Sequence, residues 1–196
     1  MSARTARSIW LAAGVTAVVA STGLAPADAK ERLDSFAGSC SVQGTTHFSP
    51  PATNTLQRLT TVYDASGTCS GTLDGRQVSD APVQMHNVGD ADGSCPYAHT
   101  IAPGQGSITF ADGTTIRYSF EFTSVATEVY LTMKGERSGS ATAHASFLTQ
   151  RTPPDVTVKC GGEGVSEVPM DLSLITDSPL VSRHGPGRSP SPKGGS

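Results

Sequence analysis

The stretch GSITFADGTTIRYSFEFTSVATEVYLTMKGERSGSATAHASFLT, residues 106–149, carries the strongest structural signal in the chain. Side chains alternate between the two faces of a β-strand, whereas in a helix one face repeats every three to four residues. Four apolar sets recur here with a period of two: Ile108 and Phe110; Ile116, Tyr118, Phe120 and Phe122; Val129, Leu131 and Met133; Ala141, Ala143, Ala145 and Phe147. The pattern predicts four antiparallel strands, each with one apolar and one polar face.

Parity predicts the first turn, because residues directly opposite each other in an antiparallel pair share a face. The first two apolar sets are both even-numbered, so the loop between them must hold an odd number of residues. Ala111-Asp112-Gly113 supplies such a loop, with glycine where a left-handed residue is needed. This turn sets Ile108 opposite Ile116 and Phe110 opposite Thr114.

The second and third turns follow by the same argument. The second loop must be even, and the four residues Ser124 to Thr127 satisfy that condition. The third turn is longer and polar, around Lys134 to Ser140. The predicted pairs are Phe122 with Val129, Phe120 with Leu131, Tyr118 with Met133, Leu131 with Ala143, and Val129 with Ala145.

The opposite face of these strands is polar and weakly charged, which is typical of a solvated sheet. It consists of Arg117, Ser119, Glu121, Thr123, Tyr130, Thr132, Thr142, His144 and Ser146.

Residues 1–29 read as a secretion signal. Arg4 and Arg7 form a basic start, residues 9–20 are apolar, and Ala27-Asp28-Ala29 is a typical cleavage site. The apolar run is too short to span a membrane, and no second run follows. We therefore expect a secreted, extracellular protein without an integral membrane segment. The full chain has a formal net charge of −3 and no basic patch, which argues against nucleic acid as a partner.

The four cysteines all follow the signal, and an even number in an exported chain predicts two disulfides. The sequence contains no Cys-x-x-Cys spacing, which would indicate zinc ligands instead of disulfides. A hairpin centred between Asn54 and Thr55 sets Phe48 opposite Thr61, Thr46 opposite Tyr63 and Cys40 opposite Cys69. We therefore predict the pairs Cys40 with Cys69 and, by exclusion, Cys95 with Cys160. A tight turn at residues 64–67 would end this pairing early.

The remaining segments are shorter. Residues 83–88, 97–101 and 156–160 are predicted strands, and Met170, Leu172 and Leu174 alternate again. Beyond Thr176 the chain is rich in Gly, Pro and Ser, so residues 177–196 are predicted to be a disordered tail. The fold prediction is all-β: one domain over residues 30–176, a single antiparallel barrel or sandwich of about eight to ten strands.

Catalytic signatures are not evident. The sequence has no Gly-x-Ser-x-Gly, Ser-x-x-Lys or His-Glu-x-x-His motif, and Asp90-Ala91-Asp92-Gly93 fits a turn better than a calcium loop. Glu121 and Glu128 are most simply surface charges. His47, His86, His99 and His144 are isolated in sequence, and three of them assembled in space would be needed for a metal site. No cofactor, metal or catalytic residue is assigned.

Ligand binding inside a barrel is a further possibility. Small closed barrels hold one apolar molecule when their interior is not filled. The candidate ligand residues share the apolar face: Tyr118, Phe120, Phe122, Leu131, Met133 and Phe147. The simpler interpretation is that they fill the core. The exposed Ser and Thr rows offer another contact surface, for cell wall or protein.

Three motifs, Cys69-Ser70-Gly71, Gly106 to Thr114 and Tyr118-Ser119-Phe120, resemble those of short secreted β-rich proteins of high-GC bacteria. The resemblance covers about half of the exported chain. It implies export and a β-rich fold, and it brings no active site.

The sequence therefore favours a non-enzymatic extracellular binding module for a small apolar ligand or a cell-envelope partner. One alternative is a hydrolase-like secreted enzyme assembled from dispersed residues, with His47, His86, His99 and nearby carboxylates as candidates. The other alternative is a structural, envelope-associated protein.

Overall fold

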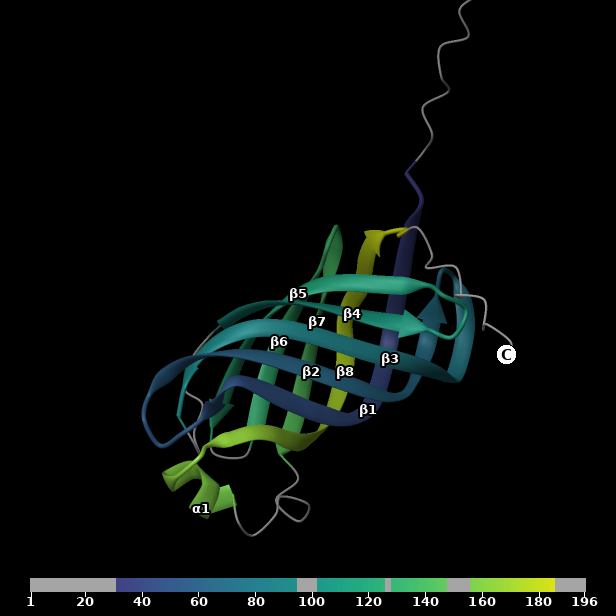
Figure 1. Ribbon diagram of the computed structural model, residues 1–196. Helices are drawn as coiled ribbons and strands as arrows, with labels where there is room; N and C mark the ends of the chain where they lie inside the picture. The colour runs from purple at the N-terminus through teal and green to yellow at the C-terminus, as the bar shows by residue number, and fades with distance from the viewer. Residues whose placement is uncertain (1–30, 95–101, 126–127, 148–155, 186–196) are drawn as a thin grey trace, which may run out of the picture. The chain divides into compact units, whose positions relative to one another are not determined.

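The computed structural model describes residues 31–94, 102–125, 128–147 and 156–185. One short helix, α1 (Val156–Gly161), precedes the last strand (Figure 1). The strands are β1 (Leu33–Ala52), β2 (Gln57–Leu73), β3 (Arg76–Gly93), β4 (Ala102–Phe110), β5 (Thr115–Val125), β6 (Glu128–Gly135), β7 (Ser138–Phe147) and β8 (Val165–Arg183).

The eight strands form one closed antiparallel barrel in chain order. Each strand pairs with the next, and β1 pairs with β8, so closure removes the free edges of the sheet. The all-β prediction is confirmed, and of the two architectures left open the protein adopts the barrel. No helix in the described part of the chain has the length and apolarity needed to cross a membrane.

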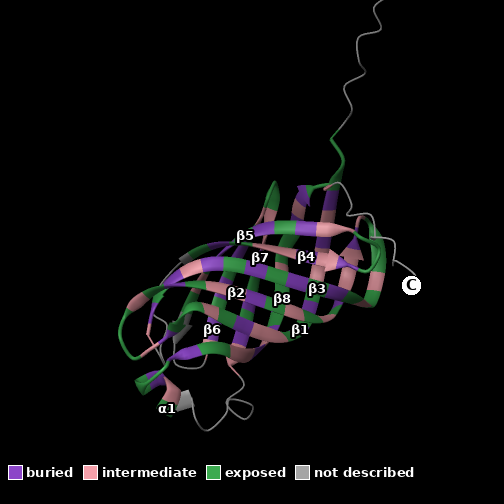
Figure 2. Cartoon of the chain, in the orientation of Figure 1, coloured by how far each residue is buried: buried purple, intermediate pink, exposed green. Residues whose placement is uncertain are grey.

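The barrel interior is the hydrophobic core. Buried and exposed residues alternate along the strands, as the banding in Figure 2 shows. Tyr118, Phe120, Leu131 and Met133 are all buried in one core cluster, so Phe120 and Leu131 lie on the same side of the sheet, as predicted. The Phe120 ring packs over a small residue of the next strand: Gly104 on β4 lies directly opposite Phe120 on β5, and a Cβ at Gly104 would lie 2.2 Å from Cζ of Phe120.

The first predicted hairpin is confirmed. Ile108 lies opposite Ile116, the Phe110 N–H donates to the Thr114 carbonyl at 2.9 Å, and Gly113 has a φ of +90°. The third register is also confirmed, with Leu131 opposite Ala143.

The second hairpin register was wrong by two residues. Phe122 pairs with Leu131 and Phe120 with Met133, because β5 continues to Val125 and β6 begins at Glu128. Parity allowed either an inner loop of two residues or one of four, and the shorter loop keeps more ladder hydrogen bonds. The faces are unchanged.

The β1–β2 pairing is confirmed in detail. Phe48 lies opposite Thr61, Thr46 opposite Tyr63, and Cys40 opposite Cys69 in a disulfide with a Cα–Cα distance of 4.1 Å. Residues 64–67 continue β2 and form no turn. The second predicted pair includes Cys95, which lies outside the described residues, so it stays a prediction. Its other member, Cys160, is buried in a small cluster with Ala52, Leu59 and Val165.

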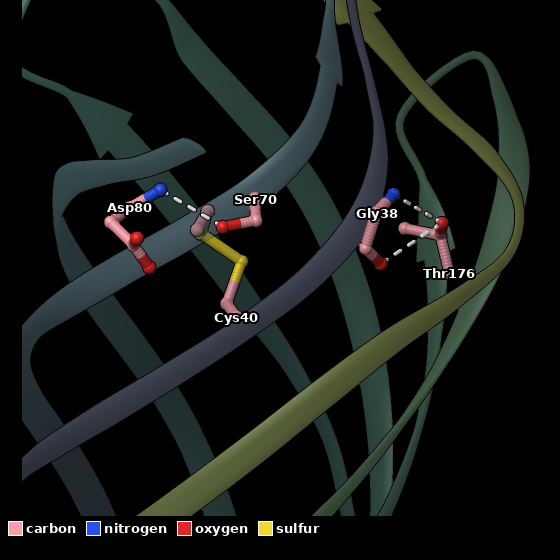
Figure 3. Close-up of a disulfide and its surroundings, with 6 residues drawn as sticks. Gly38, Cys40, Ser70, Asp80 and Thr176 are labelled. Atoms are coloured by element: carbon pink, nitrogen blue, oxygen red, sulfur yellow. Dashed lines mark hydrogen bonds between the residues drawn. A yellow bond between two sulfur atoms is a disulfide. The ribbon is translucent and has the colours of Figure 1, made fainter. Parts of the chain in front are cut away.

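Both ladders beside this disulfide are interrupted. The β1–β8 register shifts between Phe36 and Ser39, and there the hydroxyl of Thr176 accepts from the Gly38 N–H at 2.8 Å and donates to its carbonyl at 3.2 Å (Figure 3). The β2–β3 register shifts between Cys69 and Gly71. There the Asp80 N–H donates to Ser70 Oγ at 2.9 Å. Hydroxyls thus replace missing ladder bonds where the strands bend.

Two other segments differ from the prediction. Residues 156–160 are helical: α1 ends in a glycine-rich turn, where the N–H groups of Gly162 and Gly164 both donate to the Lys159 carbonyl. The β-branched residues Val156, Thr157 and Val158 have a high strand propensity. Gly162 and Gly164 favour the end of a helix at this point. The predicted tail boundary at Thr176 was also wrong, because β8 continues to Arg183, pairing with Leu33. Residues 97–101 and 186–196 lie outside the described residues.

Candidate functional site

The six predicted ligand residues all face the barrel interior, but they surround little empty space. Phe120, Phe122, Leu131 and Phe147 line a small apolar cavity of about 60 Å³ at one end of the barrel. Tyr118 and Met133 lie deeper and are fully buried. A volume of that size holds roughly two water molecules. The interior therefore corresponds to the filled core of the simpler interpretation.

Polar groups in this core are paired with each other. The Tyr118 hydroxyl donates to Asn87 Oδ1 at 2.6 Å, and the Tyr63 hydroxyl donates to the Met170 carbonyl at 3.2 Å. Burial raises the pKa of Tyr118 well above its usual range. Burial also raises the pKa of Tyr63, as does the nearby carboxylate of Asp171. Both phenols therefore stay neutral and donate hydrogen bonds. Such satisfied polar pairs favour one arrangement of the side chains in the core.

A larger hollow lies on the outer wall. It has a volume of about 600 Å³, and the backbone of inward-facing residues such as Cys40, Ala143 and Leu174 contributes to its floor. Coiled strands give a barrel a hyperboloid shape, so its outer wall is concave along the strands. We call this hollow the outer groove; its outward side chains are Ser39, Ser41, Thr68, Ser70, Asp80, Tyr130, Thr142, His144, Ser173 and Ile175.

Strand register arranges these side chains in two rows across the wall. The first row joins Tyr130 on β6, His144 on β7, Ser173 on β8, Ser41 on β1 and Thr68 on β2, each directly opposite the next. The second row joins Thr142, Ile175, Ser39 and Ser70 in the same way, and Asp80 follows through its hydrogen bond to Ser70, which Figure 3 shows. The β1–β8 pairing that closes the barrel therefore also assembles the groove.

One end of the groove carries an aromatic side chain. Tyr130 is 53 % exposed, and its ring centroid lies 5.0 Å from that of His144. His144 Nε2 lies 2.6 Å from Oε2 of Glu128, and the other carboxylate oxygen, Oε1, accepts from the Ser146 hydroxyl at 3.2 Å. These contacts orient the His144 ring on the edge of the groove, next to the exposed face of Tyr130.

A second, smaller hollow of about 300 Å³ lies on the wall formed by β3, β4 and β5. It is lined by Val88, Gly89, Asp90, Pro103, Gly104, Gln105 and Ser119. It offers fewer hydroxyls than the outer groove and has no aromatic ring.

The histidines named for an enzyme are not brought together. His47 Nδ1 lies 3.7 Å from Glu167 and His86 Nδ1 lies 2.6 Å from Asp64, as separate exposed pairs. His99 lies outside the described residues. Glu121 faces Thr132 across the β5–β6 ladder, whereas Glu128 faces Val125, so these carboxylates are not opposite each other. Within the described ranges, no cluster of three or more His, Cys, Asp or Glu is placed to hold a metal ion.

No family model, curated protein or solved structure matches this chain.

The sequence identified only part of the outer groove. Tyr130, Thr142 and His144 were predicted on the polar face, and they are exposed. Ser39, Ser41 and Ser173 were missed as a site, although serine alternates with buried residues in each of their strands. That alternation was the available signal. It does not reveal which strands are neighbours, because the β1–β8 pairing joins opposite ends of the chain.

Proposed function

We propose that this protein is a non-enzymatic extracellular binding module that holds a cell-envelope partner in its outer groove. The single observation that carries the proposal is the difference in volume between the interior cavity and the outer groove. The interior offers about 60 Å³, whereas the outer groove offers about 600 Å³. Ligand sites usually measure about 300–1,000 Å³. The outer groove lies well within this range, the smaller hollow on the other wall reaches only its lower limit, and the interior cavity falls far below it.

The surroundings of the groove support binding without chemistry. Its side chains are mainly hydroxyls, and the nearby ion pair of His144 with Glu128 is 52 % and 37 % exposed, which is typical of a surface pair. The Ser146 hydroxyl and His144 Nε2 both contact the Glu128 carboxylate, which is not the Ser–His pair of a typical hydrolase. The extracellular location rests on the predicted signal and is consistent with the Cys40–Cys69 disulfide.

Co-sedimentation tests this function. The exported chain, residues 30–196, is mixed with insoluble bacterial cell-wall material that has been stripped of protein and lipid. We expect the wild type to sediment with this material and Ser173→Tyr to stay in the supernatant, because the new ring fills the groove. Ser119→Tyr, in the smaller hollow on the other wall, is the matched control and should sediment like the wild type.

Two results would overturn the proposal. If Ser173→Tyr sediments as fully as Ser119→Tyr and the wild type, the outer groove is not the binding site. If only Ser119→Tyr fails to sediment, the binding site is the smaller hollow. Release of soluble fragments from the wall material over time would instead support the enzyme alternative.

A further inference from the structure

The charge of the outer groove restricts its ligand. The groove has six Ser and Thr side chains and no Lys or Arg; its ionisable groups are Asp80 at one end and His144 and the Tyr130 phenol at the other. Phosphate and carboxylate groups are recognised by Arg, Lys or clustered N–H donors. A polyanionic wall polymer or an anionic lipid therefore meets only one side chain that can carry a positive charge, His144, and this side chain already faces the Glu128 carboxylate at 2.6 Å. A neutral, hydroxyl-rich ligand matches the lining.

The backbone of the wall argues against an extended peptide. Peptides that add to a sheet need an unpaired strand edge for main-chain hydrogen bonds. The barrel is closed through β1 and β8, so the groove floor is made of paired strands. Recognition must therefore come from side chains, and these are mostly short hydroxyls that donate and accept single hydrogen bonds.

The groove is also long. From Tyr130 on β6 to Thr68 on β2 the first row crosses β7, β8 and β1. Adjacent strands lie about 4.8 Å apart, so the row measures roughly 19 Å along the curved wall of the barrel. That length accommodates several linked sugar units side by side.

Two exposed apolar surfaces lie within this length. Tyr130 is 53 % exposed and Ile175 is 58 % exposed. An aromatic ring offers a large, rigid and amphipathic surface, with an apolar face and a polar hydroxyl. The apolar C–H face of a pyranose ring packs on such a surface, while its hydroxyls reach the neighbouring Ser and Thr side chains.

We propose that the outer groove binds a neutral glycan chain laid across the strands, with one sugar ring stacked on Tyr130 and the following sugars hydrogen-bonded along Ser173, Ser41 and Thr68. This inference rests on the proposed function and names the class of ligand for the same groove. Tyr130 acts through its ring face, and its hydroxyl is secondary.

Isothermal titration with defined soluble ligands tests the inference. The probes are the β-1,4-linked tetrasaccharides of glucose and of N-acetylglucosamine, an α-linked mannan oligosaccharide, and poly(glycerol phosphate) as the anionic comparator. We expect at least one neutral glycan to bind, poly(glycerol phosphate) not to bind, and Tyr130→Ala to weaken binding about tenfold, equivalent to ~1.4 kcal/mol. Tyr130→Phe should stay within about twofold of the wild type, because the ring face is kept.

The outcomes separate the two proposals. If the wild type sediments with wall material through the groove but binds only poly(glycerol phosphate), or if Tyr130→Ala equals the wild type, the glycan inference is wrong and the binding function stands. If Ser173→Tyr has no effect on sedimentation, the proposed function fails and the glycan inference fails with it. Because Tyr130 is exposed, Tyr130→Ala should lower the unfolding temperature only slightly, through the loss of its cross-strand contact with His144.

Discussion

Tyr130 on β6 lies directly opposite His144 on β7, with their ring centroids 5.0 Å apart and an interplanar angle of 39°. The imidazole is itself held by Glu128 at 2.6 Å. The exposed tyrosine at the end of the groove is therefore supported from one side, and a rigid side chain loses less conformational freedom when a ligand binds.

His144 should act as a positioning residue for Tyr130. We expect His144→Ala to weaken glycan binding by up to about fivefold, since cross-strand aromatic pairs contribute at most ~1 kcal/mol. Titration calorimetry measures this change. His86→Ala is the matched control, because His86 also pairs with a carboxylate but lies on another part of the wall. Equal effects of the two substitutions would contradict the role given to His144.

The Cys40–Cys69 disulfide should contribute strongly to stability. It joins residues 29 apart in sequence across two directly opposed strand positions. Loop closure of this size restricts the unfolded chain by about 3–4 kcal/mol. We expect the double variant Cys40→Ala, Cys69→Ala to lose about that much unfolding free energy in urea. A loss below about 1 kcal/mol would show that the strand pairing alone holds this part of the barrel.

A side chain at Gly104 should destabilise the barrel. A Cβ there would lie 2.2 Å from Cζ of Phe120, whereas a Cβ at Gly161 would meet nothing within 4 Å. We expect Gly104→Ala to cost about 1–3 kcal/mol through overpacking, and Gly161→Ala to be close to neutral. Urea unfolding provides the measurement. Adding Phe120→Leu to Gly104→Ala should recover part of the loss, and a fully additive double variant would contradict the contact.

The buried tyrosines should make the barrel sensitive to alkali. Burial raises the pKa of Tyr118, so above about pH 10 the unfolded chain releases this proton while the folded barrel keeps it. Stability therefore falls as pH rises beyond that point, by up to ~1.4 kcal/mol per pH unit for each such group. Tyr118→Phe should be less stable at neutral pH by ~1–3 kcal/mol, because Asn87 Oδ1 loses its donor.

Urea unfolding at about pH 8 and about pH 11 checks the sign of this effect. The difference between wild type and Tyr118→Phe should narrow at the higher pH. A constant difference would show that the Tyr118 phenol ionises in the folded state as readily as in the unfolded chain.

Much of the fold follows from parity in the sequence. Alternation alone places Phe120 and Leu131 on the same face, and the hairpin centred at residues 54–55 places Cys40 opposite Cys69. Parity does not distinguish a two-residue loop from a four-residue loop, which is why the pairing of Phe122 was wrong. The helix at Val156–Gly161 was not predicted, because its β-branched residues favour a strand. The helix signal consists only of the glycines at its end.

The outer groove was predictable only in part. Ser41 and Ser173 are far apart in the chain and become direct neighbours through the β1–β8 pairing. Alternation shows that each side chain faces outward, but the closure of the sheet is a long-range property that local patterns do not encode. The volume of the interior was equally beyond the sequence, because it depends on how rings such as Phe120 pack against Gly104.

Amide chemical shifts on addition of a neutral oligosaccharide test the central claim most directly, because they report the location of binding on the barrel. Perturbations should concentrate at Tyr130, His144, Ser173 and Ser41, with Ser119 on the other wall unaffected. Shifts confined to the apolar end of the barrel, at Phe122 and Phe147, would contradict the account and place the ligand at the barrel interior.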